Sequence, residues 1–350
     1  TNYLNGMRKL SYQCDILTGE IKKGELRCTK PTVSMASEIN STEAAVKYTS
    51  NMSVVDNPLM DWHRDRYKLW LIDDGIRSSL GVFLPRNISR ATENGATLLE
   101  VTGYDLSILA KEDCITERLS LAQGTLYLDQ VQSLLISCGI TKIIADASTA
   151  TLQSTRDDWD IGTPKLTIIN QLLSEISFRS LEIDKNGAAL LKRYEPPSAS
   201  NITHIYREGK ASIVEPDTTT DSNLYEIPNI WIATVSNPDL EEPLKAQYIN
   251  DNPLSKTSTV DTGQNKVKVL SFDNIATQED LQNAVEKQAF EDMQGIETTE
   301  FNTAVVADHG VNDTVALSLP QYSGILVETS WEIDLDAMTM THTGKKAVDY

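Results

Sequence analysis

The residues from Gly124 to Tyr194 constrain the fold of this chain most strongly, because they contain two helical patterns followed by a hairpin pattern. The first helical pattern is GTLYLDQVQSLLISCG, in which apolar residues recur at the spacing of one helix face. Thr125 is placed to cap the start of this helix, and Gly139 to end it. The spacing therefore predicts one amphipathic helix.

The second helical pattern, KLTIINQLLSEISF, follows a polar connector that ends in RDDWDIGTP. Thr163 can cap this helix, and Pro164 can occupy its first position, where the missing N–H has no partner to lose. The apolar residues that cover a broad face are Leu166, Ile168, Ile169, Leu172, Leu173 and Ile176. A face this wide predicts a helix more buried than the first.

A hairpin is predicted after the two helices. Leu181 and Ile183 alternate with polar residues, and Asn186-Gly187 supplies two positions that tolerate positive φ. Residues 188–194 then return as a strand. The stretch as a whole predicts an α/β module of two helices on a small sheet, which by itself fits many functions.

Residues 1–115 show strand patterns at short spacing with no long helix between them. Two runs, residues 76–84 and 88–92, are predicted strands, and the second is expected to pair with residues 97–102 across Asn94-Gly95. This spacing is typical of a small barrel or sandwich.

The chain changes character after residue 195. Two prolines in EPPSASN indicate a linker, short strands are expected at residues 202–206 and 211–214, and the polar tract from Pro216 to Asn223 is expected to be a surface loop. Strands are then predicted at residues 229–235 and 266–272, a helix from Thr277 to Gly295, and four more strands toward the C-terminus.

These patterns predict a mostly-β α+β fold with two small β-barrel domains joined by an α/β module that has two helices on a small sheet. The expected division is a first β-barrel-like domain at residues 1–115 and the α/β module at 116–195. A linker with short strands is expected at 196–228, and a second β-barrel-like domain with one flanking helix at 229–350.

The net charge of −19 opposes binding to a nucleic-acid backbone, since no local basic patch offsets it. No apolar run reaches the ~18 to 20 residues needed to cross a bilayer, and no export-signal pattern is visible. Cys14, Cys28, Cys114 and Cys138 form no C-x-x-C pair. Reduced, structural thiols in a soluble protein are therefore expected.

The common catalytic and nucleotide-binding motifs, among them G-x-S-x-G, the P-loop, G-x-G-x-x-G and H-E-x-x-H, are absent from the sequence. Asp61, His63 and Asp65 alternate and could face a metal ion, but a polar turn before the strand at residue 67 explains them equally well. The second candidate cluster, around a predicted turn, consists of Asp308, His309 and Asp313.

A third candidate is a group of acidic residues in the connector between the two predicted helices. Asp157, Asp158 and Asp160 could offer paired carboxylates to a glycoside or a cation. The alternative is a solvated loop before the helix, where acidic residues favour the helix dipole.

The five tryptophans are dispersed rather than clustered, which favours core or interface anchors: Trp62, Trp70, Trp159, Trp231 and Trp331. We therefore expect no catalytic, cofactor-binding or metal-binding residues, and a function carried by surfaces.

Several stretches together resemble the tail-tip or baseplate hub proteins of tailed bacteriophages and their prophage relatives, of the late control protein D type. The stretches are DRYKLWLIDDG, LGVFLP, EVTGYDLSILAKED, AQGTLYLDQVQSLLISCGI, DWDIGTPKLTIINQLLSEISFRSLEIDKNGAALLKRYEPPS and VETSWEIDLDAMTMTHTGKKA. The resemblance is strongest from Tyr67 to Pro197 and at the C-terminus.

The resemblance implies a non-enzymatic homotrimer whose two small barrels per chain form a ring of six. Such a ring adapts the six-fold tail tube to a three-fold tip in the virion, after assembly in the bacterial cytoplasm. The implied partners are the distal tail or tail tube protein, the tape measure protein, and tip or receptor-binding proteins. DNA would pass through the lumen without specific binding, and an acidic lumen would keep it from sticking. Because the sequence ends soon after SWEIDLDAMTMTHTG, any lytic activity is expected on another protein.

Two alternatives stay open at this point. A cell-wall (peptidoglycan) hydrolase of the tail would use Asp157, Asp158 and Asp160, and predicts a concave pocket with one carboxyl of raised pKa. A secreted carbohydrate-binding or adhesive β protein predicts exposed aromatic residues on one barrel face and oxidised cysteines.

Overall fold

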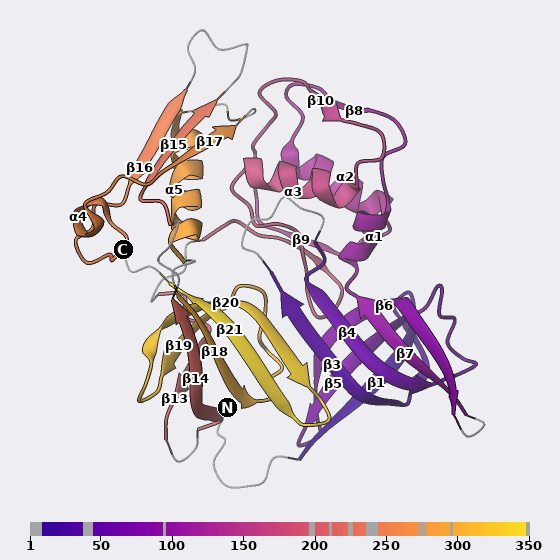
Figure 1. Cartoon of the computed structure of the whole chain (residues 1–350). Helices are drawn as coiled ribbons and strands as arrows, with labels where there is room; N and C mark the ends of the chain where they lie inside the picture. The colour runs from indigo at the N-terminus through magenta and orange to yellow at the C-terminus, as the bar shows by residue number, and fades with distance from the viewer. Residues whose placement is uncertain are drawn as a thin grey trace.

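The computed structural model describes residues 9–37, 45–93, 96–195, 200–209, 212–222, 227–235, 244–272, 275, 278–294 and 297–347. Two β units lie side by side, and each has a smaller α/β unit above it in the view of Figure 1. One sheet path runs through both β units in the order β14-β18-β21-β20-β3-β4-β7-β6-β5-β1-β2. Off this path, β19 pairs with β20, and β13 pairs with β19. The mostly-β α+β fold is thus confirmed, and the described strands form no closed barrel.

The N-terminal β unit consists of the first seven strands. They are β1 (Leu10–Thr18), β2 (Ile21–Leu26), β3 (Cys28–Ala36), β4 (Tyr48–Val55), β5 (Arg66–Asp73), β6 (Ile76–Glu93) and β7 (Ala96–Tyr104). On β5, buried and half-buried residues alternate, which places Tyr67, Leu69 and Leu71 in the core.

The long strand β6 combines the two strands that the sequence predicts at residues 76–84 and 88–92. It pairs first with β5 and then with β7, and its register with β7 shifts between Pro85 and Asn87. Because proline has no N–H to donate, a bulge at this point lets the strand continue past it. Thr92 pairs with Thr97, which confirms the predicted hairpin, although its turn at 94–95 lies outside the described residues.

The C-terminal β unit contains six strands, among them the four predicted toward the C-terminus. They are β13 (His204–Arg207), β14 (Val214–Ser222), β18 (Glu297–Ala304), β19 (Thr314–Ser318), β20 (Ser323–Asp334) and β21 (Thr339–Lys346). Strand β20 pairs with β19 through its first half and with β3 through its second half. The two β units are therefore joined edge to edge.

Strand β14 corrects the predicted surface loop from Pro216 to Asn223, since residues 214–222 pair with β18 as the last strand of the sheet. Thr218, Thr219 and Thr220 have high β propensity, and an edge strand tolerates a proline whose missing N–H faces away from its neighbour. The register shifts between Val214 and Thr218, around the proline.

The α/β module contains the two predicted helices, α2 (Tyr127–Ser137) and α3 (Lys165–Glu175), preceded by a short helix α1 (Ser107–Glu112) that the sequence analysis missed. Strands β11 (Glu182–Ile183) and β12 (Ala189–Leu191) form the predicted hairpin. The remaining short strands are β8 (Leu119–Leu121), β9 (Ile143–Ala145) and β10 (Arg156–Trp159), of which β9 pairs in parallel with β12 and β10 pairs with β8.

The helix ends in the module agree only in part with the predicted caps. Gly139, with φ +84°, follows the end of α2 as predicted. The N-cap residues are Leu126 and Pro164, however, and neither caps with its side chain. The hydroxyls of Thr125 and Thr163 bond instead to the carbonyls of Ala122 and Asp160, at 2.8 and 2.7 Å. The threonines are occupied by the preceding turns, so the predicted caps were wrong.

The second α/β unit lies between β14 and β18 in the chain. It contains β15 (Ile230–Val235), β16 (Lys245–Ile249), α4 (Thr259–Thr262), β17 (Val267–Phe272) and α5 (Gln278–Gln294). Strand β15 is antiparallel to β16 and parallel to β17. The predicted strands at 229–235 and 266–272 thus pair in a separate sheet, and not with the four C-terminal strands. Helix α5 confirms the predicted helix, while its expected cap Thr277 and end Gly295 lie outside the described residues.

The apolar cores follow the units but are shared at one point. Val305, Val311 and Trp331 of the C-terminal β unit belong to the same buried cluster as the core of the N-terminal β unit. The loop that carries the first two of these residues, residues 305–313, therefore lies between both β units. No helix in the described part of the chain is both long and apolar enough to span a membrane.

Candidate functional site

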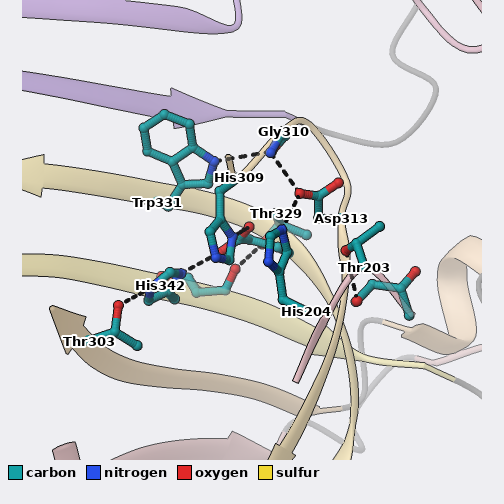
Figure 2. A network of polar contacts seen from close by, with 12 residues as sticks. Thr203, His204, Thr303, His309, Gly310, Asp313, Thr329, Trp331 and His342 are labelled. Carbon is teal, nitrogen blue, oxygen red and sulfur yellow. Dashed lines mark hydrogen bonds and ion pairs between the residues drawn. The ribbon is translucent and has the colours of Figure 1, made fainter. Parts of the chain in front are cut away.

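Three of the four histidines of the chain meet in the interior of the C-terminal β unit. His204 comes from β13, His309 from the 305–313 loop and His342 from β21 (Figure 2). Two carboxylates complete the group, Asp313 at the end of the loop and Glu328 on β20. We call these five residues the histidine cluster.

His309 and His342 are both fully buried and share one carboxylate. The Nδ1 atoms of His309 and His342 lie 2.7 and 2.5 Å from the two oxygens of Glu328. The Nε2 atom of His309 lies 2.6 Å from the Tyr206 hydroxyl, and that of His342 lies 2.8 Å from the Thr303 hydroxyl. With Glu328 ionised, its oxygens only accept, so both Nδ1 atoms carry protons and both rings can stay neutral. The Tyr206 hydroxyl can then donate to His309 Nε2, whereas the single proton of the Thr303 hydroxyl is shared between His342 Nε2 and the carbonyl of Ala304, which lies 2.9 Å away.

Burial dominates the electrostatics of this group, because charged forms lose their hydration there. It lowers the pKa of His309 to about 3. It also lowers the pKa of His342, although the hydrogen bond to Glu328 opposes the change. Burial raises the pKa of Glu328, with the bond to His342 acting in the opposite direction. The site therefore favours neutral rings around a carboxylate that readily takes up a proton.

His204 and Asp313 form a second pair at the edge of the cluster. His204 Nε2 lies 3.1 Å from Asp313 Oδ2, an atom that also accepts a 2.7 Å hydrogen bond from the Gly310 N–H. Burial opposes the charge on His204, but the hydrogen bond and charge of Asp313 outweigh it and raise the pKa of the imidazole. The same pairing lowers the pKa of Asp313 against the effect of burial.

The geometry is that of hydrogen bonding and not of metal ligation. The rings of His204 and His309 stack at 3.8 Å between centroids with only 11° between their planes. Imidazole lone pairs lie in the ring plane, so two parallel, stacked rings cannot bind one ion. In the trio of His309, Glu328 and His342, the N–O separations of 2.5 and 2.7 Å are shorter than the about 3.3 Å between ligands of a tetrahedral zinc ion.

The cluster also fixes the loop to the rest of the molecule. Trp331 on β20 donates from its indole N–H to the carbonyl of Gly310 at 3.1 Å, and its ring meets that of Tyr48 on β4 edge-on at 5.8 Å. Lys185, in the turn between β11 and β12, donates to the carbonyl of Ala307. Burial lowers the pKa of Lys185 to about 8, partly offset by nearby carboxylates. The loop thus contacts both β units and the α/β module.

The structure brings together only part of what the sequence analysis singled out around residue 308. His309 and Asp313 belong to the cluster, whereas Asp308 is exposed. Sequence reasoning missed His204, Glu328 and His342. The only signal for them was the scarcity of histidine itself, since their spacing along the chain matches no local motif.

Asp61, His63 and Asp65 do not converge on a common point. Asp61 accepts from the N–H of His63 at 3.0 Å, which is a local turn, and both residues are exposed. Asp65 is buried and bonds to Lys23 and Thr18 at 2.8 and 2.6 Å. The polar-turn alternative therefore describes this segment.

The connector carboxylates lie at the surface. Asp157 on β10 and Asp160 in the turn before α3 are exposed, and the side chain of Asp158 lies outside what the structure describes. Trp159, Trp231 and Trp331 are buried, with Trp62 and Trp70 half-buried.

All four cysteines are free thiols in the structure, and their reduced state in the cell stays a prediction. The thiols of Cys14 and Cys28 contact each other, and this contact together with burial raises the pKa of Cys14.

Comparison with solved structures shows the fold of phage tail proteins. A tail protein from Neisseria meningitidis superposes with a TM-score of 0.69 at 11% identity, over 96% of each chain. The 43 kDa tail protein of prophage MuSo2 from Shewanella oneidensis gives 0.65 at 11% identity, over 95% of this chain and 98% of that one. A prophage tail protein from Listeria monocytogenes gives 0.60 at 10% identity, over 95% and 94%. Models of protein families and curated protein sequences gave no match. The resemblance to phage and prophage tail proteins is confirmed at the level of the fold.

Proposed function

We propose that this chain is a structural, non-enzymatic hub protein of a phage or prophage tail tip or baseplate. The observation that carries the proposal is the likeness of at least 95% of the chain to three tail proteins from three different bacteria. A likeness of this extent includes both β units and both α/β units, so the whole layout supports a common structural role.

The finer proposal is a homotrimeric ring. Each chain has two β units joined edge to edge by the pairing of β20 with β3. Three chains would supply six such units, which suits an adapter between a six-fold tail tube and a three-fold tip. For the division of the chain we propose the N-terminal β unit at residues 1–115 and the α/β module at 116–195, as the sequence predicts. The predicted linker at 196–228 supplies β13 and β14 to the C-terminal β unit, so we assign residues 196–350 to this unit, with the second α/β unit inserted between β14 and β18.

The proposed neighbours are a distal tail or tail tube protein, the tape measure protein, and tip or receptor-binding proteins. DNA would pass through the lumen at ejection without specific binding. The net charge of −19 supports this part, since an acidic wall repels phosphates. Assembly would take place in the bacterial cytoplasm, with the protein ending at the tail tip of the virion.

The two alternatives have less support. A hydrolase acid needs a carboxyl in a desolvated cleft, and Asp157 and Asp160 are exposed instead. An adhesive or carbohydrate-binding protein would present exposed aromatic side chains, whereas the five tryptophans are buried or half-buried.

The test is to purify tails from the phage or prophage that encodes this chain and to locate the protein on them. Antibody labelling at one end of the tail, with three copies per tail by quantitative mass spectrometry, would support the hub. Labelling along the whole tube, or absence from purified tails, would contradict it. A peptidoglycan dye-release assay with the purified chain distinguishes the hydrolase, because only an enzyme would release dye.

A further inference from the structure

The 305–313 loop is fixed from three sides, and the histidine cluster supplies the innermost contact. His309 is fully buried at the middle of the loop, and Val305 and Val311 enter the core shared with the N-terminal β unit. Asp313 closes the loop by accepting from the Gly310 N–H, and its own carbonyl accepts from the Glu328 N–H at 2.8 Å. Displacing His309 would therefore remove contacts between the two β units.

We propose that the histidine cluster is an acid-operated latch, which holds the 305–313 loop closed at neutral pH and releases it in mild acid. Opening would loosen the joint between the N-terminal and C-terminal β units. This inference goes beyond the proposed tail function and does not depend on it.

Burial explains why the closed latch resists protonation. A first added proton can be taken up by the trio of His309, Glu328 and His342, which neutralises its carboxylate. A further proton makes the trio positive at a place where neither imidazole is exposed to water that could solvate the charge. The hydroxyls of Tyr206 and Thr303 can turn to accept from a protonated Nε2, so the cost is one of buried charge and not of lost hydrogen bonds.

The surrounding charges do not stabilise the trio once it carries this second proton. The titratable groups that act on the trio are His204 and Tyr206 on β13, Asp308 and Asp313 in the loop, Lys185 in the turn between β11 and β12, and Tyr48 on β4. Lys185 and a protonated His204 oppose added positive charge, and Asp313 is already paired with His204. Asp308 is exposed, so solvent screens its effect.

The sign of the pH dependence follows from the pKa directions. His309 and His342 have pKa values below the ordinary 6.5, so the open loop binds more protons than the closed loop as pH falls below about 6.5. Glu328 and His204 have raised pKa values and act in the opposite direction. The pKa of Asp313 is lowered, and this acts only in stronger acid. Opening lets His309 and His342 take up two protons, whereas the closed cluster already holds about one. A net uptake of about one proton increases the population of the open loop about tenfold for each pH unit below pH 6.

Hydrogen exchange of the full chain tests this directly. Protection of the Gly310 and Glu328 amides, corrected for intrinsic exchange rates, should fall about tenfold between pH 6 and pH 5. Amides of β6 and β7 should keep their protection, which separates loop opening from global unfolding. Equal protection of the loop at both pH values would overturn the proposal.

Variants give the matched comparison. The double variant His309→Gln/His342→Gln keeps a donor and an acceptor on each side chain but cannot titrate at these positions, so loop protection should no longer fall as the pH is lowered from 6 to 5. His63→Gln changes the exposed fourth histidine and should behave as wild type. If the double variant fails to fold, a pH titration of the imidazole NMR resonances in the wild-type chain tests the proposal instead. Titration of His309 and His342 at their ordinary pKa with the loop still protected would refute the latch, as would one equivalent of tightly bound zinc that His309→Gln abolishes.

Discussion

Replacing Gly103 by alanine should destabilise the N-terminal β unit through one side chain, Tyr67. A Cβ atom at Gly103, on β7, would lie 2.2 Å from the Tyr67 hydroxyl oxygen, 2.8 Å from Cζ and 2.9 Å from Cε1. Carbon atoms in ordinary contact are about 3.5 to 4.0 Å apart. Tyr67 is fully buried and its ring stacks on Phe83 at 5.5 Å, so it has little room to move. Overpacking of this kind costs about 1–3 kcal/mol, and we expect the upper half of that range.

The assay is the free energy of unfolding of the N-terminal β unit, measured by hydrogen exchange of β4 and β7 amides under increasing urea. Gly19→Ala is the contrasting variant, because Gly19 has φ +59° and nothing within 4 Å of its added Cβ, so only backbone strain of about 1 kcal/mol should appear. Tyr67→Phe removes the closest atom and should recover part of the loss when combined with Gly103→Ala. A Gly103→Ala variant within about 0.5 kcal/mol of wild type, or strict additivity with Tyr67→Phe, would refute the reasoning.

Three further predictions concern the α/β module and use urea unfolding of the purified chain. Leu172→Ala, at a fully buried position on α3, should destabilise the module by about 2–5 kcal/mol because it leaves a cavity, and an unchanged transition would contradict this packing. Asp157→Asn combined with Asp160→Asn should stay within about 0.5 kcal/mol of wild type and leave any peptidoglycan dye release unaltered, whereas abolished release would restore the hydrolase alternative. Arg156→Met should cost about 3 kcal/mol because it removes the buried guanidinium that pairs with the carboxylate of Glu175, leaving the neutral hydroxyl of Tyr127 as a donor to a charge that is no longer compensated. Adding Glu175→Leu should recover part of this loss, and no recovery would show that the ion pair is not the cause.

Elements with a strong local period were predictable from the sequence. Helices α2, α3 and α5 each carry apolar residues on one face, and the hairpin at Asn186-Gly187 has a turn that demands positive φ, which Gly187 adopts at +84°. The end of α2 at Gly139 followed from the same preference for a left-handed position. The start of α2 was not predictable, because the Thr125 hydroxyl donates to the carbonyl of Ala122, three residues earlier, and does not cap the helix.

Elements defined by distant partners were not predictable. Strand β9 is three residues long and gains its structure by pairing in parallel with β12, which leaves no local pattern. Strand β14 looks like a loop because eight of its nine residues are not buried. The histidine cluster joins His204 to Asp313 across 109 residues and Glu328 to His342 across 14. The pairing of β13 with β19, of β19 with β20 and of β20 with β21 brings these groups together within the C-terminal β unit.

The central claim, a trimeric hub, is tested most directly by the mass of the native assembly in solution, with the neighbouring tail proteins present and with imaging of the particle. The chain has a mass of 38.8 kDa. We predict a species that contains three copies of it, seen as a three-fold ring around a central channel. A chain that stays monomeric in the presence of its tail neighbours, or that assembles without a channel, would contradict the hub.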